Sequence, residues 1–594
     1  MQYLLTIGLA AFICTKGFAV AEDEKAKALF ENLYAEYLEL RPEVATRQGK
    51  KIGFDRWRDY SIQGESKVFE QAKEHLKRLK TELSREKLNQ KNQLVYDLIK
   101  FQYEQELEAY QWRVHHSPIN HMRGVHKEFV SLLTNYHTVD SLSDAQAYLK
   151  RLGGIPSALQ GVSTRLDRAV KNKIYGSHQT YTRIQDALQK ILKSLPIADN
   201  SSEQLFFSDF RNKVETLKIS DKDKQALLKQ AKHTLNKRVH PALQKFLTKV
   251  KKIQAANRSD DGLWRNPKGK EYYQNRLNYF TSTQMRASEV HQLGLREVSR
   301  IHGEMKLIKD KVGYKGTLQE FFTHMRSNKK FILPNTDEGR KLYIDSLEQY
   351  KQLMKDNIHL AFSRMPIAKL EIKRVEPYRE KNSSAAFYQS GVPDGSKPGV
   401  YYANLADMNG MPTYLAESLF YHEAVPGHHF ERSISIERQG VPQFQRYFKN
   451  TAYTEGWALY AEALAKELGG FKDPYSDFGR LNWELRRALR LVVDTGLHDQ
   501  GWSRQKAIDY FKNNSSFPMS DVVNQIDRYL VIPGQATAYK IGMIKIQELR
   551  QLAEEKLGKK FVLAEFHDFL LGQGPLPLTI VESQVMSWIE MKGR

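Results

Sequence analysis

Apolar residues recur three and four positions apart over most of the chain, as in Phe69, Ala72, Leu76 and Leu79. This spacing puts them on one face of an α-helix, because a helix completes one turn every 3.6 residues. Only residues 399–404 (GVYYAN) have the composition of a good β-strand, and they follow a turn-rich segment. The pattern therefore predicts a mainly α protein with a small β-sheet.

The length of 594 residues predicts more than one folded unit, because single cores stop growing at about 250–300 residues. A turn at residues 259–262 (SDDG) is the predicted boundary between an N-terminal helical lobe, 22–262, and a C-terminal lobe, 263–594. Within the first lobe, residues 153–156 (GGIP) are predicted to end one helix and begin another, and Pro241 is predicted to break a basic helical stretch.

The first 21 residues are predicted to form a signal peptide. They are apolar and end in Ala-Val-Ala before two acidic residues, which is typical of cleavage after Ala21. The prediction is a periplasmic or secreted protein, and the alternative is a buried first helix. A lipid anchor on Cys14, the only cysteine, is less favoured because Ile13 precedes it. No later run is long and apolar enough to span a membrane, so no integral membrane segment is expected after cleavage.

The chain is strongly basic, with 91 Lys and Arg against 69 Asp and Glu. The basic residues are spread through the predicted helices rather than gathered in one run, which favours a solvated surface over a nucleic-acid groove. No nucleic-acid partner is therefore expected. The positive charge would draw in acidic substrates or hold the protein at an anionic envelope surface. The oligomeric state stays open.

Residues 421–430 (YHEAVPGHHF) begin like the zinc-binding motif H-E-x-x-H, in which two His one helical turn apart reach one Zn²⁺. Here Pro426 occupies the position of the second His. On a straight helix His428 would lie about 240° round from His422, and His429 about 10.5 Å along the axis. Pro426 breaks the helix, however, and Gly427 tolerates a bulge. A bulge that absorbs two residues makes His428 the second ligand, which we favour, and one that absorbs three makes it His429.

A later helical segment, residues 454–462 (TEGWALYAE), supplies the predicted third ligand, Glu455. A carboxylate completes the ligand set of a catalytic zinc site that keeps one position open for water. Glu462 shares a helix face with Glu455 and is predicted to accept a hydrogen bond from a ligating imidazole. His422, His428 and Glu455 are thus the predicted ligands of one Zn²⁺ per chain.

Three motifs carry a resemblance to a known family: HExxPGHH at 422–429, TEGWA at 454–458 and YxxxPGQAxxYxxG at 529–542. Together they resemble the bacterial family called domain of unknown function 885, which is similar to gluzincin metallopeptidases. The stretched histidine spacing is similar to that of dipeptidyl peptidase III. The resemblance extends from about residue 272 to 578, and more loosely over the N-terminal helices. It implies a two-lobed, zincin-like helical fold with the sheet beside a deep cleft, and zinc-dependent hydrolysis of peptides. Glu431 stands where Gln is frequent in the family.

With zinc in place, Glu423 is the predicted general base, because it adjoins a ligand without being one. Tyr539 is the first candidate to stabilise an oxyanion, and Arg528, Tyr529 and His498 are further candidates for oxyanion or carboxylate binding. A half-buried core position is the alternative for each of them. Asp494, four residues before His498, is predicted to orient that imidazole. Residues 399–404 are predicted to be an edge strand that pairs with an extended peptide.

The sequence therefore predicts an exported zinc metallopeptidase that acts on peptides small enough to enter a cleft. One alternative is a zinc amidohydrolase that acts on cell-wall or acylated amino-acid amides. Another is a non-catalytic, basic envelope protein, against which the presence of Glu423 argues. No G-x-S-x-G nucleophile elbow is present. Endo- versus exopeptidase action and sequence preference stay open.

Overall fold

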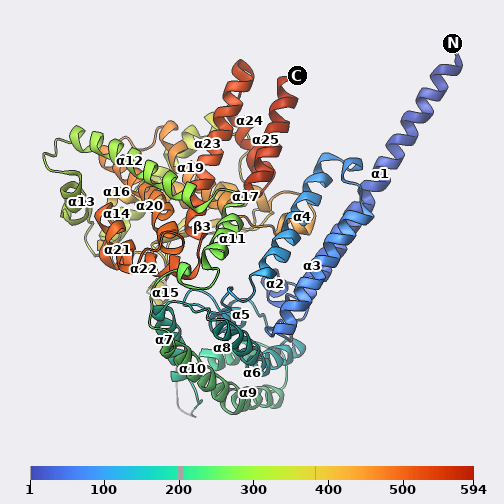
Figure 1. Ribbon diagram of the computed structural model, residues 1–594, viewed down its shortest axis with the longest axis vertical. Coiled ribbons are helices and arrows are strands. Elements are labelled where there is room, and N and C mark those ends of the chain that lie inside the picture. Colours follow the sequence, from blue (N-terminus) through green and yellow to red (C-terminus); the bar gives the residue numbers. More distant parts are fainter. Residues whose placement is uncertain (1, 198–204, 381–382) are drawn as a thin grey trace. The chain divides into compact units, whose positions relative to one another are not determined.

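The computed structural model describes residues 2–197, 205–380 and 383–594. It divides the chain into two compact units that are each built mainly of α-helices (Figure 1). The first contains Met1–Asp261, Arg265–Gly269 and Pro442–Phe444, and the second contains Gly262–Trp264, Lys270–Val441 and Gln445–Arg594. The protein is therefore mainly α, as the helical periodicity predicts.

Several helices of the first unit begin at a residue whose side chain caps the helix. Ser61, Asn89, Ser141, Ser177 and Ser220 each accept a hydrogen bond from the backbone N–H three residues later. The helices are α1 (Gln2–Glu39), α2 (Pro42–Arg47), α3 (Ile62–Glu82), α4 (Gln90–Gln111), α5 (Val125–Asn135), α6 (Leu142–Lys171), α7 (His178–Lys193), α8 (Leu205–Glu215), α9 (Asp221–Thr234) and α10 (His240–Ala255). The residues of the predicted signal peptide lie in α1, apart from residue 1, which is outside the described residues.

Of the two helix breaks predicted in this unit, the one at residues 153–156 is wrong, whereas the one at Pro241 coincides with an interruption of the α-helix. Helix α6 continues through Gly153–Pro156, with Pro156 in its interior. Trp57 packs at this point and donates a hydrogen bond from Nε1 to the Arg151 carbonyl at 2.7 Å, so tertiary contacts hold a segment with poor helix propensity. Pro241 lies in the first turn of α10, where no intrahelical N–H is needed, and a π-helical turn, Leu235–Val239, joins α9 to it.

The second unit surrounds α20 (Pro474–His498), which is buried along almost its whole length. It packs against α12 (Ala287–Lys311) and α16 (Thr413–Glu423), while α19 (Thr451–Glu467) packs against α23 (Ala538–Leu557). The other helices are α11 (Gly269–Thr281), α13 (Leu318–Ser327), α14 (Asp337–Asn357), α15 (Pro377–Glu380), α17 (His428–Ile436), α18 (Gln443–Arg446), α21 (Arg504–Asn513), α22 (Met519–Val531), α24 (Leu563–Gly572) and α25 (Leu578–Gly593).

A three-stranded sheet in the second unit has the order β1-β3-β2. Strand β1 (Leu370–Arg374) is parallel to β3 (Gly399–Ala403), and β2 (Ala386–Gln389) is antiparallel to it. The prediction that residues 399–404 form an edge strand is wrong, because β3 is the central strand and all of its residues are buried. The edge strand β2 was not predicted. Its four residues are too few to show a clear alternation.

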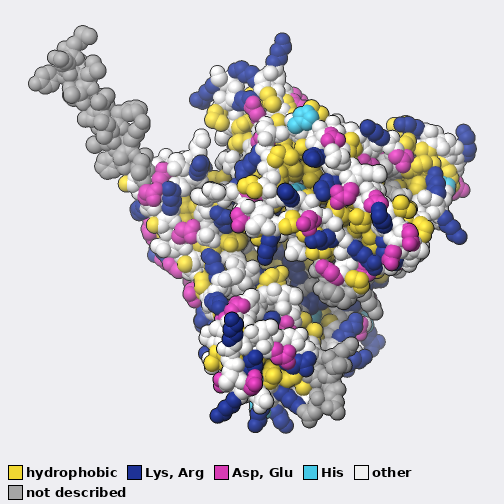
Figure 2. All heavy atoms as spheres, turned by 180° about the vertical axis from the view of Figure 1, so that it is seen from behind, with side chains coloured by type: hydrophobic (Ala, Val, Ile, Leu, Met, Phe, Trp, Pro, Cys, Tyr) yellow, Lys and Arg dark blue, Asp and Glu magenta, His cyan; other side chains and the backbone are white. Residues whose placement is uncertain are grey.

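Charged side chains of both signs are scattered over the face shown in Figure 2, where dark-blue Lys and Arg and magenta Asp and Glu lie among yellow hydrophobic and white atoms. Such a mixture of charges is typical of the solvated surface that the spread of basic residues along the sequence predicts. Among the residues that the structure describes, no helix combines the length and apolar composition needed to cross a membrane.

Candidate metal centre

The break between α16 and α17 shapes the candidate metal centre. Helix α16 ends at Glu423 and α17 begins at His428, with a cis peptide bond between Val425 and Pro426. A Cβ atom at Gly427 would lie only 2.0 Å from the His422 carbonyl oxygen, so only glycine fits there. Trp457 of α19 donates a hydrogen bond from Nε1 to the Pro426 carbonyl at 3.0 Å. The turn is therefore tied to the helix that carries Glu455.

The three predicted ligands, His422, His428 and Glu455, converge beside this turn. Nε2 of His422 and Nε2 of His428 lie 3.7 and 3.6 Å from Oε2 of Glu455. In a tetrahedral site with metal–ligand bonds of about 2.0–2.1 Å, donor atoms lie about 3.3–3.4 Å apart. The His422 and His428 side chains are 5% exposed and that of Glu455 is 21% exposed. Two imidazoles and one carboxylate with this spacing fit a zinc ion after a contraction of a few tenths of an ångström.

The opposite nitrogen of His422 is held by the predicted partner. Nδ1 of His422 donates to Oε1 of Glu462 at 2.8 Å, and Glu462 also accepts a hydrogen bond from Ser418. With the proton on Nδ1, Nε2 of the neutral imidazole is left to bind a metal. Burial alone would raise the pKa of Glu455, but in the metal-free site the interactions with the His422 and His428 imidazoles outweigh burial and hold that pKa well below its usual value.

His429, which the sequence left as an alternative to His428, is directed elsewhere. Its Nδ1 lies 3.0 Å from the Tyr388 hydroxyl and 3.4 Å from the Ser433 hydroxyl. The ring of His428 instead lies against that of His422, with centroids 4.9 Å apart. The path of the turn therefore brings His428, and not His429, to Glu455.

Glu423, the predicted base, lies at the same centre. One atom each of His422, Glu423 and His428 lie within 4.8 Å of one another. By proximity alone, either Glu423 or Glu455 could be the third ligand. We assign it a different role, because its Oε2 accepts a hydrogen bond from the Tyr388 N–H of β2 at 3.0 Å. The bond directs one oxygen to the sheet edge and leaves Oε1 to accept a proton.

Tyr539 lies on α23, which packs closely against α19, the helix of Glu455. A Cβ atom at Gly456 would lie 2.5 Å from the backbone of Gly542, so the two helices meet at these glycines. Tyr539 is one turn before Gly542, and its hydroxyl accepts a hydrogen bond from Arg528 at 3.3 Å. The structure thus brings two of the predicted supporting residues, Tyr539 and Arg528, into contact with each other.

The close approach of these helices gives a stability prediction. We expect Gly456→Ala to lower the free energy of unfolding by about 1–3 kcal/mol, because the added methyl group meets the backbone of Gly542. Gly303→Ala, in the exposed part of α12, is the matched control. Its Cβ would have no atom within 4 Å, so it should stabilise the helix by about 0.5–1 kcal/mol. Denaturant unfolding followed by circular dichroism measures both. Equal effects at the two sites would contradict the proposed helix contact.

The predicted site role of His498 does not fit the structure. Both ring nitrogens bind backbone groups: Nδ1 accepts from the Leu263 N–H at 3.2 Å and Nε2 donates to the Tyr529 carbonyl at 3.0 Å. Burial lowers the pKa of His498 to about 4, so the imidazole is neutral. Asp494 does not orient it, because Oδ1 of Asp494 accepts hydrogen bonds from Tyr273 and Gly534 instead. His498 is a packed structural residue, since its neighbours satisfy both nitrogens.

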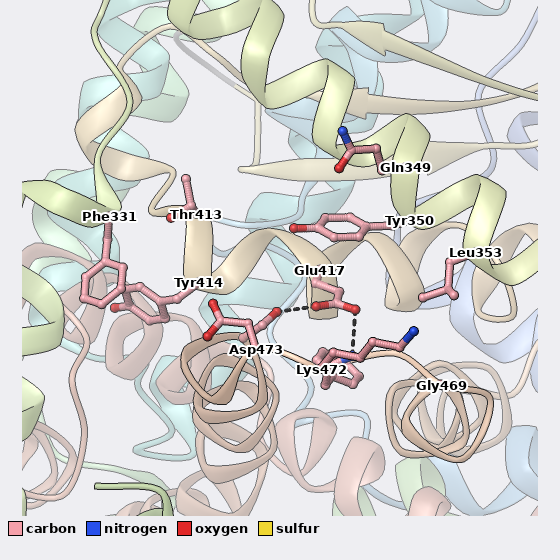
Figure 3. Close-up of a pocket in the computed structure, with 12 residues that line it drawn as sticks. Phe331, Gln349, Tyr350, Leu353, Thr413, Tyr414, Glu417, Gly469, Lys472 and Asp473 are labelled. Carbon is pink, nitrogen blue, oxygen red and sulfur yellow. Dashed lines mark hydrogen bonds between the residues drawn. The ribbon is translucent and has the colours of Figure 1, made fainter. Parts of the chain in front are cut away.

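A separate pocket of about 330 Å³ opens on another face of α16 (Figure 3). Glu417 is at its centre and accepts hydrogen bonds from the Phe471 N–H at 2.8 Å and from the Ser476 hydroxyl. Because Tyr421 also donates to Glu417 at 2.9 Å, this buried carboxylate is fully engaged in holding the structure together. The pocket includes none of the converging metal-centre residues.

The sequence profile of a family described as bacterial protein of unknown function (DUF885) matches residues 42–585. The chain belongs to the DUF885 family. This DUF885 protein is 28% identical to a candidate lipoprotein from Colwellia psychrerythraea, with a TM-score of 0.85 over 96% of this chain and 99% of that one. It also shares its fold with a candidate lipoprotein of unknown function from Shewanella oneidensis, at 18% identity and a TM-score of 0.74 over 94% and 99% of the two chains. None of the curated proteins matches it significantly.

In this DUF885 protein, sequence reasoning missed three residues at or beside the candidate metal centre: Tyr388, Arg487 and Arg490. Tyr388 was missed because its strand is short. Arg487 and Arg490 lie on α20 and are 5% exposed. Their signal was available, because Arg residues in the otherwise apolar segment 485–493 (LRRALRLVV) are unusual in a buried helix.

Proposed function

We propose that the protein is a zinc-dependent hydrolase that cleaves peptide bonds. The observation that carries the proposal is the approach of His422 Nε2 and His428 Nε2 to Glu455 Oε2, at 3.7 and 3.6 Å. A buried set of two imidazoles and one carboxylate, with a further Glu beside it, is the donor set of zinc hydrolases. Zinc bound there would act as a Lewis acid that polarises a carbonyl group and acidifies water.

The protein's own groups supply the proton transfers. Glu423 takes a proton from the attacking water at Oε1, because its Oε2 is engaged by the Tyr388 N–H. It then passes the proton to the leaving amine. The Tyr539 hydroxyl accepts a hydrogen bond from Arg528, which leaves its own proton to donate to the carbonyl oxygen as negative charge develops. The edge strand β2 presents backbone groups beside Glu423, where an extended peptide would be held.

We further propose that the protein is exported to the cell envelope. The apolar leader with Ala-Val-Ala before residue 22 supports export, as does similarity to candidate lipoproteins of the same fold. The excess of basic residues would favour peripheral association with an anionic envelope surface. Hydrolysis of cell-wall or acylated amino-acid amides is the second candidate function, since the same metal centre serves any amide.

Elemental analysis of purified protein, combined with peptide hydrolysis before and after chelation, tests the function. We expect about one zinc per chain, loss of hydrolysis on chelation and recovery when zinc is added. Activity in metal-free protein would contradict the proposal. Hydrolysis of cell-wall fragments but not of peptides would select the amidohydrolase alternative.

A smaller effect is expected for Glu462, which touches the imidazole and not the metal. Glu462→Gln should weaken zinc binding by about 10–100-fold, because the carboxylate that fixes the His422 tautomer is lost. Competition with a chromogenic chelator measures this. Glu371→Gln, on an exposed part of β1, is the control and should leave zinc affinity as it is in the wild type. An unchanged affinity in Glu462→Gln would show that this contact does not support the ligand.

A further inference from the structure

A group of arginine side chains adjoins the metal centre. Arg487 and Arg490 lie one turn apart on α20 and are each 5% exposed. Nη2 of Arg487 is 3.7 Å from Oε1 of Glu462, the carboxylate that holds His422. Cζ of Arg490 lies 4.5 Å from the centre of the Tyr539 ring. Both guanidinium groups also interact electrostatically with Glu455.

The charge of this group is poorly balanced. Among the described residues, the hydrogen-bond partners of Arg490 are neutral groups: the Tyr529 hydroxyl at 2.9 Å and Oε1 of Gln525 at 3.3 Å. Arg528 likewise bonds Oε1 of Gln535 at 2.6 Å and the Tyr539 hydroxyl. Within the described part of the chain, neither guanidinium has a carboxylate oxygen within 4.0 Å.

Buried Arg490 also has an unused hydrogen-bond donor. Its Nη1 is shielded from solvent and has no hydrogen-bond partner among the described residues. A buried guanidinium without a carboxylate is costly, so such groups are found where an anion completes the site. Glu455 does not serve this purpose when it binds a metal, and Glu462 is already engaged by His422 and Ser418.

We infer that Arg490 and Arg528, which both contact Tyr539, form a subsite that binds a carboxylate of the substrate. The inference rests on the proposed function for its substrate, a peptide. A guanidinium group matches a carboxylate with two parallel hydrogen bonds, which fixes position as well as charge. The carboxylate is either the C-terminus of the peptide or an Asp or Glu side chain. In the first case the enzyme removes residues from the C-terminal end.

Binding to uncleaved peptides tests the subsite. Full-length zinc-loaded Glu423→Gln protein would be titrated calorimetrically with acetyl-Ala-Ala-Ala, with its C-terminal amide and with acetyl-Ala-Glu-Ala amide. We expect the free acid, the Glu-containing amide, or both to bind about 10–100-fold more tightly than the plain amide, as a charged hydrogen-bonded pair predicts. The tighter of the two identifies the source of the carboxylate.

Substitutions test whether Arg490 and Arg528 are the residues that bind the carboxylate. When Arg528→Gln or, separately, Arg490→Lys is added to the Glu423→Gln protein, the ratio of the affinity for the carboxylate peptide to that for the plain amide should fall toward one. Adding Arg211→Gln, at an exposed arginine that pairs with Glu215, should leave the preference unchanged. Equal affinity for all three peptides would overturn the subsite, as would a preference that survives both substitutions. Selective carboxylate binding by a protein whose wild type cleaves no peptide would support the subsite and contradict the proposed hydrolysis.

Discussion

Glu423→Gln lowers kcat for peptide hydrolysis by about 10²–10⁴-fold while the protein keeps about one zinc per chain. Gln removes the proton acceptor but not the anchoring contact, because its side-chain oxygen still accepts a hydrogen bond from the Tyr388 N–H. The substitution should therefore separate the chemical step from metal binding and from folding. Steady-state kinetics and elemental analysis on the same preparation measure the two quantities.

Two results would contradict the role of Glu423. Full turnover in Glu423→Gln would remove it as the base. Loss of zinc would instead make it a ligand, as its position within 4.8 Å of His422 and His428 also allows. Glu371→Gln, whose exposed carboxylate pairs with Lys373, serves again as control and should retain both zinc and activity.

His428→Ala removes zinc from the protein, whereas His429→Ala retains it. Nε2 of His428 is 3.6 Å from Oε2 of Glu455, while His429 is engaged by Tyr388 and Ser433. Loss of a ligand should exceed the about 10–100-fold weakening that follows loss of an outer partner. Activity should be lost with the zinc. Elemental analysis after dialysis against a weak chelator gives the comparison.

The pair is well matched, because the two histidines are adjacent and both are buried. His429→Ala should cost about 1–3 kcal/mol of stability, since the buried Tyr388 hydroxyl loses a partner. Circular dichroism distinguishes that effect from metal loss. Zinc retained in His428→Ala but lost in His429→Ala would mean that the turn at 424–427 takes the other path in solution.

Motif residues were the part of the candidate centre that could be predicted. Helical periodicity placed Glu455 and Glu462 on one face, and the structure has Glu462 bonded to His422. Local rules favoured His428 over His429 but kept both open, because Pro426 and Gly427 permit more than one bulge. The Trp457 contact with the Pro426 carbonyl fixes the turn from another helix.

Predictions failed where distant segments control a residue. His498 has the residue type of a site group, but Leu263 and Tyr529 satisfy its nitrogens. Of the predicted strand 399–404, residues 399–403 form β3, yet its central position depends on pairing with β1 and β2. Helix α6 continues past Gly153–Pro156 while packed against Trp57.

The sequence by itself determined the helical class and the residue types available for metal binding, because periodicity and side-chain chemistry are local properties. Only the tertiary structure decided which imidazole meets Glu455, which strand lies beside Glu423 and that Arg490 adjoins Tyr539. The physical reason is that these contacts join segments far apart in the chain. Their geometry depends on how buried helices pack, which no local spacing specifies.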